Sequence, residues 1–211
     1  MASLAAELAW MMASMIVYLE TDRLLLRRLT AADEDELVLL DSDPEVMRFL
    51  TGGVPTPRAE IRDQVLPRLL AYYSQGNDFG FWAAVERLTG DFIGWFHFRP
   101  HPGGTAVDGP DGPGIELGYR LRRAAWGKGY ATEGCRALIR KGFAESGVER
   151  IYAETMTVNQ ASRRVMEKSG LSYVRTFHQD WPDAIAGSEH GEVEYALTRA
   201  EWEAQQAASA E

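Results

Sequence analysis

The stretch Ala125-Trp126-Gly127-Lys128-Gly129-Tyr130-Ala131-Thr132-Glu133 decides how this chain is expected to fold. Before it, residues 115–121 predict a short strand, and after it a helical pattern runs from about Tyr130 to Glu145. Two glycines separated by one residue therefore fall where a strand gives way to a helix. Glycine lets the backbone approach a ligand closely, and the N–H groups of a helix start point outward. Together with the helix dipole, this turn suits a phosphate group.

The spacing of the two glycines matches neither of the common phosphate-loop motifs. A dinucleotide-binding loop needs Gly-x-Gly-x-x-Gly, but the sixth residue counted from Gly127 is Thr132. Gly127-Lys128 also lacks the preceding glycine and the following Ser or Thr of a Walker A loop. Taken alone, the fragment is therefore also compatible with an ordinary tight turn.

Two further segments accompany the turn, Glu116-Leu117-Gly118-Tyr119 before it and Asn159-Gln160-Ala161-Ser162-Arg163-Arg164-Val165-Met166-Glu167-Lys168-Ser169-Gly170-Leu171 after it. Together these segments resemble the GNAT superfamily of acetyl-CoA-dependent N-acetyltransferases. They are most similar to its RimJ/RimL branch, whose named members acetylate the N-termini of ribosomal proteins. The resemblance extends from Thr21-Asp22-Arg23-Leu24 to Glu194-Tyr195-Ala196-Leu197-Thr198-Arg199 and so covers most of the chain. It implies a GNAT-like α/β fold, with a mixed, mostly antiparallel twisted sheet, splayed central strands and helices on both faces.

The rest of the chain also alternates between strands and helices, which is typical of a mixed α/β protein. Apolar spacing and turn residues predict strands over residues 23–29, 81–86, 92–98, 115–121, 150–156, 171–178 and 192–198. They predict helices over residues 30–40, 44–50, 57–74, 130–145 and 160–168. Pro67 is expected to kink or split the third of these helices, and the Gly-, Pro- and Asp-rich residues 99–114 are expected to form an exposed loop.

Length and composition predict a single domain. The chain has 211 residues, of which 45% are apolar, and this is enough for a sizeable core. We expect residues 1–14 to be a loosely ordered N-terminal extension, with a short docking helix as the alternative. Residues 15–202 are expected to form the single GNAT acetyltransferase domain, and residues 203–211 a C-terminal tail.

Charge and cysteine content narrow the choice of partners. The net charge of −9 and the pI of about 5.0 argue against a nucleic-acid partner. An acidic surface suits a cationic amine substrate, although acidic surfaces also occur simply to keep proteins in solution. The single cysteine excludes an intrachain disulfide, and no Lys or Arg precedes Arg23 as a secretory signal would require. These features favour a cytoplasmic protein without a membrane partner; a homodimer is possible.

The resemblance implies that acetyl-CoA enters between strands 115–121 and 150–156. Its pantetheine would lie beside the backbone of about Tyr119–Leu121, and its pyrophosphate would meet the amides of the glycine turn. Trp126 stands where the wider family has Gln or Arg, a departure that the RimJ/RimL branch shares. Asn159 matches an asparagine of the branch that can bond the cofactor and cap the following helix. The implied cofactor-binding residues are Tyr119, Leu121, Trp126, Gly127, Lys128, Gly129, Tyr130, Ala131 and Asn159.

Glu116 is the first candidate for the catalytic base. It lies on the strand that would border the acetyl group, where the wider family often places a catalytic glutamate. An amine must lose a proton before it attacks a thioester, and a carboxylate can accept that proton directly or through water. The alternative is a structural strand carboxylate, and the rival bases are His97, His178 and Asp180.

Ser162 is the candidate proton donor to the departing thiolate. Many GNAT proteins use a tyrosine for this role, at the position where this chain has Met166, which cannot donate a proton. Ser162 falls where RimL-like members carry a serine, although a small residue there could equally serve close helix packing. Cys135 is expected to be a core thiol, and no spacing of His, Cys or carboxylates predicts a metal site.

The sequence therefore predicts transfer of an acetyl group from acetyl-CoA to a primary amine by direct attack in a ternary complex. The acceptor could be a protein N-terminus or a small amine, and its pocket is expected from residues 33–74 and 180–192. The alternative is a catalytically weak acyl-CoA-binding module that acts as a sensor or scaffold.

Overall fold

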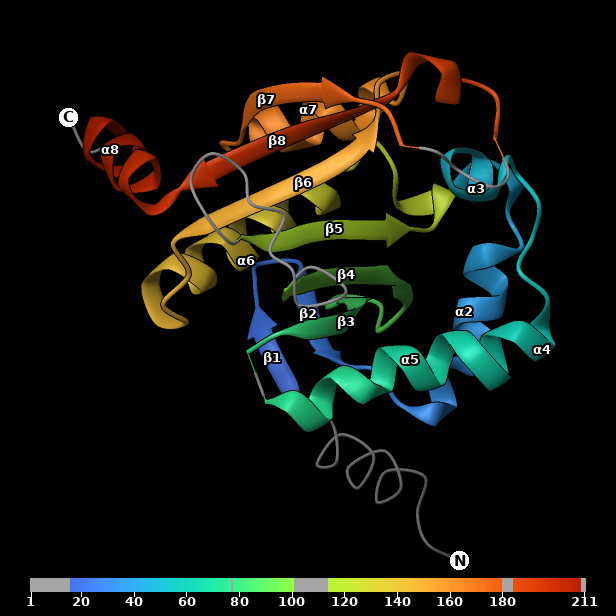
Figure 1. The fold of residues 1–211 in the computed structure, drawn as a ribbon. Helices are drawn as coiled ribbons and strands as arrows, with labels where there is room; N and C mark the ends of the chain where they lie inside the picture. Colours follow the sequence, from blue (N-terminus) through green and yellow to red (C-terminus); the bar gives the residue numbers. More distant parts are fainter. Residues whose placement is uncertain (1–15, 77, 101–113, 180–183, 210–211) are drawn as a thin grey trace, which may run out of the picture.

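The computed structural model describes residues 16–76, 78–100, 114–179 and 184–209, so the predicted N-terminal extension and Asp180 lie outside the described residues. In the described residues, eight strands form one sheet in the order β1-β2-β3-β4-β5-β6-β8-β7 (Figure 1). The strands are β1 Val17–Glu20, β2 Leu24–Arg28, β3 Gly80–Glu86, β4 Phe92–Pro100, β5 Ile115–Leu121, β6 Arg150–Met156, β7 Ser172–Phe177 and β8 Glu192–Thr198. All pairs are antiparallel except β5 with β6, which confirms the predicted mixed, mostly antiparallel sheet.

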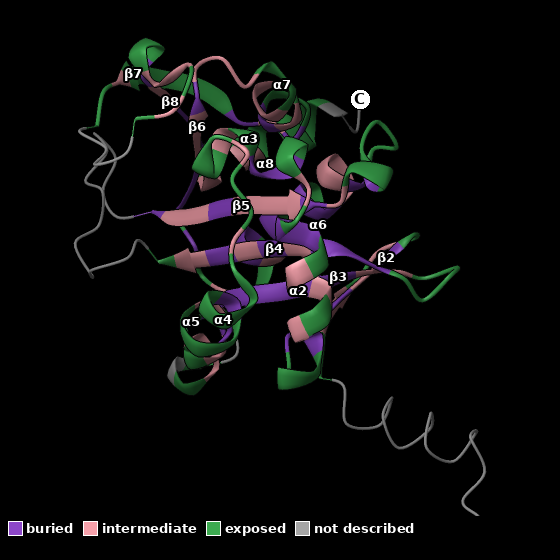
Figure 2. Cartoon of the chain, turned by 90° about the vertical axis from the view of Figure 1, so that its right-hand side faces the viewer, coloured by how far each residue is buried: buried purple, intermediate pink, exposed green. Residues whose placement is uncertain are grey.

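Helices cover both faces of this sheet. The α-helices are α2 Glu34–Asp41, α3 Pro44–Thr51, α4 Arg58–Glu60, α5 Leu66–Ala71, α6 Tyr130–Glu145, α7 Gln160–Lys168 and α8 Arg199–Ser209. Apolar side chains of α6 and α7, such as Leu138 and Met166, form one core with residues of the central strands. On the opposite face, Leu37 of α2 and Leu69 of α5 form a second core with Phe81 and Ala83 of β3. Figure 2 shows that the central strands are largely buried or half-buried, whereas α4 and α5 expose their outer sides.

The pairing of β5 with β6 stops after two positions. Ile115 is paired with Ile151 and Glu116 with Tyr152, and the strands then diverge. By contrast, β5 pairs with β4, and β6 with β8, along seven positions each. The edges of β5 and β6 that face each other therefore lack a partner strand beyond Glu116 and Tyr152. This splay is the opening that the GNAT resemblance implied.

Three features differ from the sequence prediction. The strand β1, Val17–Glu20, pairs with β2 and was not predicted. The helix expected over residues 57–74 is divided near Pro67, as predicted, but it also contains an unpredicted π-helical segment, Ile61–Val65, which ends two residues before Pro67. The extra residue in this turn accommodates a proline that cannot donate its backbone nitrogen to the helix. Where a tail was expected from Glu203, helix α8 continues to Ser209 and packs through Trp202 against Phe143, with ring centroids 5.5 Å apart.

Among the described helices, none combines the length and the apolar character that crossing a bilayer requires.

Candidate active site

The glycine turn has the backbone conformation that a phosphate-binding turn needs. Gly127 and Gly129 have φ angles of +72° and +85°, in the left-handed region that favours glycine. Gly129 is the N-cap of the 16-residue helix α6, and its carbonyl accepts the N–H of Glu133 at 3.0 Å. Because Gly129 has no side chain, it cannot cap the N–H groups of the first turn. The indole of Trp126 fixes the start of the turn by donating to the carbonyl of Leu121 at 2.8 Å.

Arg23, from the turn between β1 and β2, holds the glycine turn from outside. Its guanidinium donates to the carbonyl of Lys128 at 2.9 Å and pairs with the carboxylate of Glu133 in the first turn of α6, at 2.5 Å. Glu133 also accepts a 2.6 Å hydrogen bond from the hydroxyl of Thr21. Burial would raise the pKa of Glu133, but these hydrogen bonds outweigh it and the pKa is lowered. Arg23 thus neutralises a carboxylate that would otherwise repel a phosphate at this helix start.

A second contact fixes the first residue of α6. The hydroxyl of Tyr130 donates to the carboxylate of Glu86 at the end of β3, and Thr89 donates to the same carboxylate at 2.9 Å. These hydrogen bonds hold the pKa of Glu86 below its usual value. The guanidinium of Arg23 lies 4.7 Å from the centre of the Tyr130 ring. The predicted cofactor residues Lys128 and Tyr130 are therefore held by side chains from more than forty residues away in sequence.

Asn159 and Ser162 lie at the start of α7, beside the splay. The side-chain oxygen of Asn159 accepts the N–H of Ser162 at 3.2 Å, which is the helix cap that we expected, and its amide nitrogen donates to Thr155 at 3.0 Å. Burial raises the pKa of Tyr119 on β5, and a hydrogen bond with Ser162 offsets part of that shift. The structure thus joins two predicted site residues, Tyr119 of β5 and Ser162 of α7. Met166, in contrast, is 6% exposed and packs in the core.

Glu116 lies on the sheet face opposite α6 and α7, where β4 supplies its partners. A guanidinium nitrogen of Arg99 lies 2.6 Å from one carboxylate oxygen, and Nε2 of His97 lies 3.4 Å from the other. His97 also packs against Phe81, with ring centroids 5.4 Å apart. The structure therefore brings together Glu116 and one of its rivals. The other described rival, His178, lies beyond β7, with its ring 3.1 Å from where a Cβ on Gly191 would stand.

Glu154 of β6 is a further candidate site residue, which the sequence did not reveal. It is half-buried and belongs to the same sheet face as Glu116 and Tyr152, because strand residues alternate between faces. Burial, followed by the charges of Glu116 and Glu194, raises the pKa of Glu154 to about 7. A polar residue inside the central strand 150–156 was the signal that could have revealed it. Whether Glu154 and Glu116 lie on the same face and close together depends on the register of β5 with β6, which cannot be read from the sequence.

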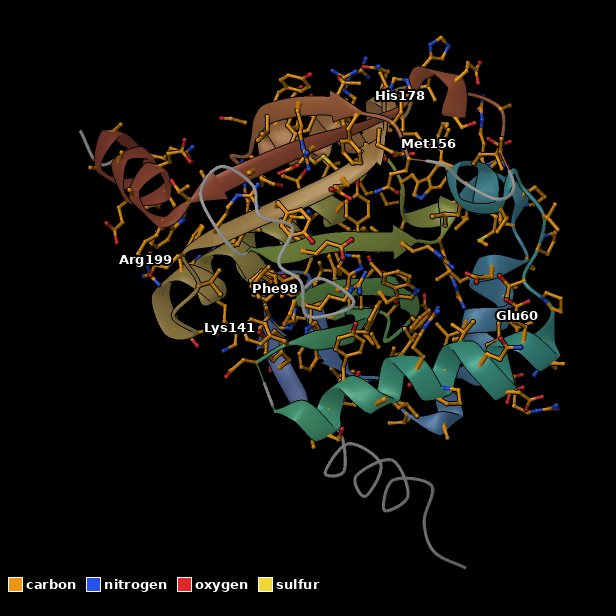
Figure 3. The ribbon with its side chains drawn as sticks, viewed as in Figure 1. Glu60, Phe98, Lys141, Met156, His178 and Arg199 are labelled. Carbon is orange, nitrogen blue, oxygen red and sulfur yellow. The ribbon has the colours of Figure 1, made fainter. Side chains whose placement is uncertain are left out.

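Two distant segments meet at the far end of this face, near the end of β6, where Figure 3 labels Met156. A Cβ on Gly52, at the C-terminal end of α3, would lie 3.2 Å from the side chain of Ile185. A Cβ on Gly187 would lie 3.4 Å from Met156. The early helices and the segment before β8, in which we expected the acceptor pocket, are therefore in contact here.

A groove of about 1220 Å³ lies elsewhere, between β1 and α6. It reaches the glycine turn only at its rim, through Gly129 and Thr132, and its lining does not include Glu116 or Ser162. Its basic residues are Arg23, Arg87, Arg136, Arg140, Lys141 and Lys168. The splay is the opening between β5 and β6, and this groove is a different feature of the surface.

Within the part of the chain that the structure describes, no group of three or more His, Cys, Asp or Glu side chains is placed to hold a metal ion. Cys135 is buried in the core, and burial raises the pKa of its thiol to about 12.

Comparison with known proteins places this site in a family. The family model described as "Acetyltransferase (GNAT) domain" matches residues 23–172, which include the glycine turn, the splayed strands and α7. The chain belongs to this family, and it is an acetyl-CoA-dependent N-acetyltransferase.

Relatives and solved structures agree with this assignment. The chain is 37% identical over 184 residues to an FsC-acetyl coenzyme A-N(2)-transacetylase of Aspergillus fumigatus, which covers 87% of this chain and 77% of the relative. It is 32% identical to the uncharacterized protein YkkB of Bacillus subtilis, over 80% of this chain and 92% of the relative. A RimL ribosomal L7/L12 alpha-N-protein acetyltransferase, solved in complex with coenzyme A, has the same fold with a TM-score of 0.68 at 17% identity. That match covers 86% of this chain and 97% of RimL.

Proposed function

We propose that the protein transfers the acetyl group of acetyl-CoA to a primary amine by direct attack in a ternary complex. The observation that carries this proposal is that β5, the strand that precedes the left-handed glycine turn, pairs with β6 at only two positions. The splay opens onto a sheet face with half-buried carboxylates, where an ammonium group would be attracted. Direct attack also agrees with Cys135, which is buried and whose raised pKa disfavours a thiolate acyl carrier.

In this proposal the cofactor is bound mainly by backbone groups. The pyrophosphate contacts the amides of the turn from Gly127 to Ala131, and the pantetheine lies along the free edge of β5 at Tyr119–Leu121. Trp126 positions the turn through its bond to Leu121, and Asn159 lines the opposite wall from α7. The carbonyl of Leu121 can accept a second hydrogen bond, because a carbonyl oxygen has two lone pairs.

The sequence predicted two side chains for the acid–base chemistry, and the proposal keeps Ser162 as the proton donor and Glu116 as a charged group beside the incoming amine. Ser162, with Tyr119 beside it, supplies a proton to the departing thiolate from the α7 side. Glu116 faces the incoming amine from β5 and is the predicted base. Ser162→Ala should lower kcat about tenfold while acetyl-CoA affinity stays unchanged, whereas the buried Met166→Ala should cost about 2–5 kcal/mol of folding stability.

The acceptor is proposed to be a small amine or a protein N-terminus. The name of the Aspergillus relative specifies transfer to an N(2) nitrogen, and that of RimL specifies a protein α-amine. The identity of 37% to the former favours an acceptor that is acetylated at an N(2) nitrogen.

Release of free CoA from acetyl-CoA tests the proposal. The acceptor panel contains an amino acid amide, spermidine and a peptide with a free N-terminal serine, and mass spectrometry identifies the acetylated product. Turnover with at least one amine is the expected result. Tight acetyl-CoA binding without turnover on a broad panel would instead favour a sensor or scaffold.

A further inference from the structure

Glu154 lies where the splay begins. The pairing of β5 with β6 ends at Glu116 and Tyr152, and paired residues of neighbouring strands point to the same face. Glu154 is therefore the next residue of β6 on the face of Glu116, just beyond the last paired position. The equivalent next residue on β5 is Gly118, which has no side chain. The ring of His97 covers Gly118, with Nε2 at 2.6 Å from where a Cβ would stand.

Glu154 differs from its neighbours in how it is paired. Glu116 is bound to Arg99, and the fully buried Glu194 is bound to Arg150 and, at 2.7 Å, to Arg175. The side chain of Glu154, in contrast, forms no ion pair or hydrogen bond with any residue that the structure describes. Its carboxylate is free to bind a ligand at the opening of the splay.

The charged groups that face Glu154 come from three other strands. They are Glu116 on β5, Glu192 and Glu194 on β8, and Arg175 on β7. Tyr152 lies on the same face, and its pKa is raised by burial and then by the charges of Glu116 and Glu154. Burial and the surrounding carboxylates hold a proton on Glu154 up to about neutral pH, and only Arg175 opposes this.

We propose that Glu154, rather than Glu116, takes the proton from the ammonium group of the acceptor, an inference that rests on the proposed acetyl transfer to a primary amine. The carboxylate removes one proton from R–NH₃⁺, and the freed lone pair forms a C–N bond with the acetyl carbonyl carbon. The C–S bond then breaks, and the second proton lost by nitrogen ends on the CoA sulfur. The products are R–NH–acetyl, CoA thiol and protonated Glu154, which returns its proton to solvent.

The two carboxylates then have different roles. A general base works best when its proton affinity matches the working pH, and Glu154 meets this condition. Glu116 would have to break its 2.6 Å ion pair with Arg99 in order to accept a proton. Held in that pair, Glu116 is a positioning residue, which attracts the ammonium and raises the proton affinity of Glu154.

The test compares Glu154→Gln with Glu116→Gln across pH 6 to 10, using the amine that wild type acetylates fastest in the panel. For wild type we expect kcat/KM to rise with pH, with an inflection near pH 7. Glu154→Gln should lower kcat about 10²–10³-fold at pH 7 and lose that inflection. The loss should shrink toward pH 10, where the amine loses its proton without help. Glu154→Asp should recover part of the activity, and acetyl-CoA affinity, measured by calorimetry, should stay within twofold.

Glu116→Gln should keep the inflection but shift it to lower pH, because one of the carboxylates that raise the pKa of Glu154 is gone. This variant alone decides the question if Glu154→Gln does not fold. If Glu116→Gln loses the inflection, or if folded Glu154→Gln keeps wild-type kcat at pH 7, Glu154 is not the base. Wild-type protein that releases no CoA with any amine would overturn the proposed function itself, which separates that failure from this one.

Discussion

The glycine turn and the proposed acceptor side of the splay are built in opposite ways. The turn is one continuous stretch from Trp126 to Ala131, and its geometry comes from two left-handed glycines. The acceptor side is assembled from side chains of β4, β5 and β6 together with the contact between Gly52 and Ile185. A backbone site tolerates most side-chain changes and fails at a few positions. A site made of side chains from distant segments can change its ligand while the fold persists.

The largest effect is expected from Gly129→Glu, which tests the part of the site that is built from the backbone. The change forces a side chain onto a φ of +85° and adds a negative charge beside the pyrophosphate, so acetyl-CoA binding should weaken by more than about 100-fold, or about 2.7 kcal/mol. Calorimetry on folded protein measures it. Gly90→Glu is the matched control, because Gly90 has a φ of +77°, open space around it and a place in the β3–β4 turn. Equal losses in both variants would mean that backbone strain alone explains the effect.

Removal of the outer support of the turn should have a smaller effect. Arg23→Ala deletes the bond to the Lys128 carbonyl and leaves Glu133 without an ion-pair partner in the first turn of α6, so acetyl-CoA should bind about tenfold more weakly. Adding Glu133→Gln should restore part of the affinity, because the uncompensated charge is then gone. Arg62→Ala, at an exposed pair with Asp63, is the control. Unchanged affinity in Arg23→Ala would show that the glycines suffice by themselves.

On the proposed acceptor side, Ile185→Ala should weaken binding of the amine without affecting binding of acetyl-CoA. Loss of one apolar contact of about 1 kcal/mol predicts an acceptor KM about fivefold higher, with unchanged acetyl-CoA affinity. Steady-state kinetics with each substrate varied separately gives both numbers. The control is Leu88→Ala, since Leu88 is 92% exposed in the β3–β4 turn. A change in acetyl-CoA affinity instead would place Ile185 on the cofactor side.

The last effect concerns stability rather than binding. Folding raises the pKa of Glu154 from 4.5 to about 7, first by burial and then by neighbouring carboxylates. This carboxyl therefore favours the folded state while it is protonated, and the benefit is lost as pH rises from about 4.5 through about 7. Glu154→Gln cannot ionise, so at pH 8 it should be about 1–2 kcal/mol more stable than wild type, after allowance for partial exposure.

Urea denaturation at pH 8 and pH 4.5 measures this difference, which should almost vanish at the lower pH. Glu203→Gln, on the exposed side of α8, serves as the control. Equal stability of wild type and Glu154→Gln at pH 8 would show that folding does not raise the pKa of Glu154.

The sequence predicted the features that depend on neighbouring residues. Alternating strands, the helix after Gly129 and the cap at Asn159 all rest on local spacing, and the structure has them. It did not predict β1, because four residues, Val17–Glu20, give too few positions to reveal an alternating pattern.

Contacts between residues far apart in the chain could not be predicted from the sequence either. Arg23 and Glu133 are 110 residues apart, and no spacing in the chain indicates their ion pair. The relation of Glu154 to Glu116 follows from strand alternation, but only once the register of β5 with β6 is known. The glycine turn could therefore be predicted as the cofactor site from the sequence, while the proposed base Glu154 needed the tertiary structure.

The short pairing of β5 with β6 also links the cofactor to the integrity of the sheet. A pantetheine chain along the free edge of β5 would complete hydrogen bonds that a neighbouring strand provides elsewhere, so the ligand acts as part of the fold. At a cofactor concentration 100 times its dissociation constant, such a ligand adds about 2.7 kcal/mol to the free energy of unfolding. The resistance of this protein to heat and proteolysis would then follow the acetyl-CoA supply of its surroundings.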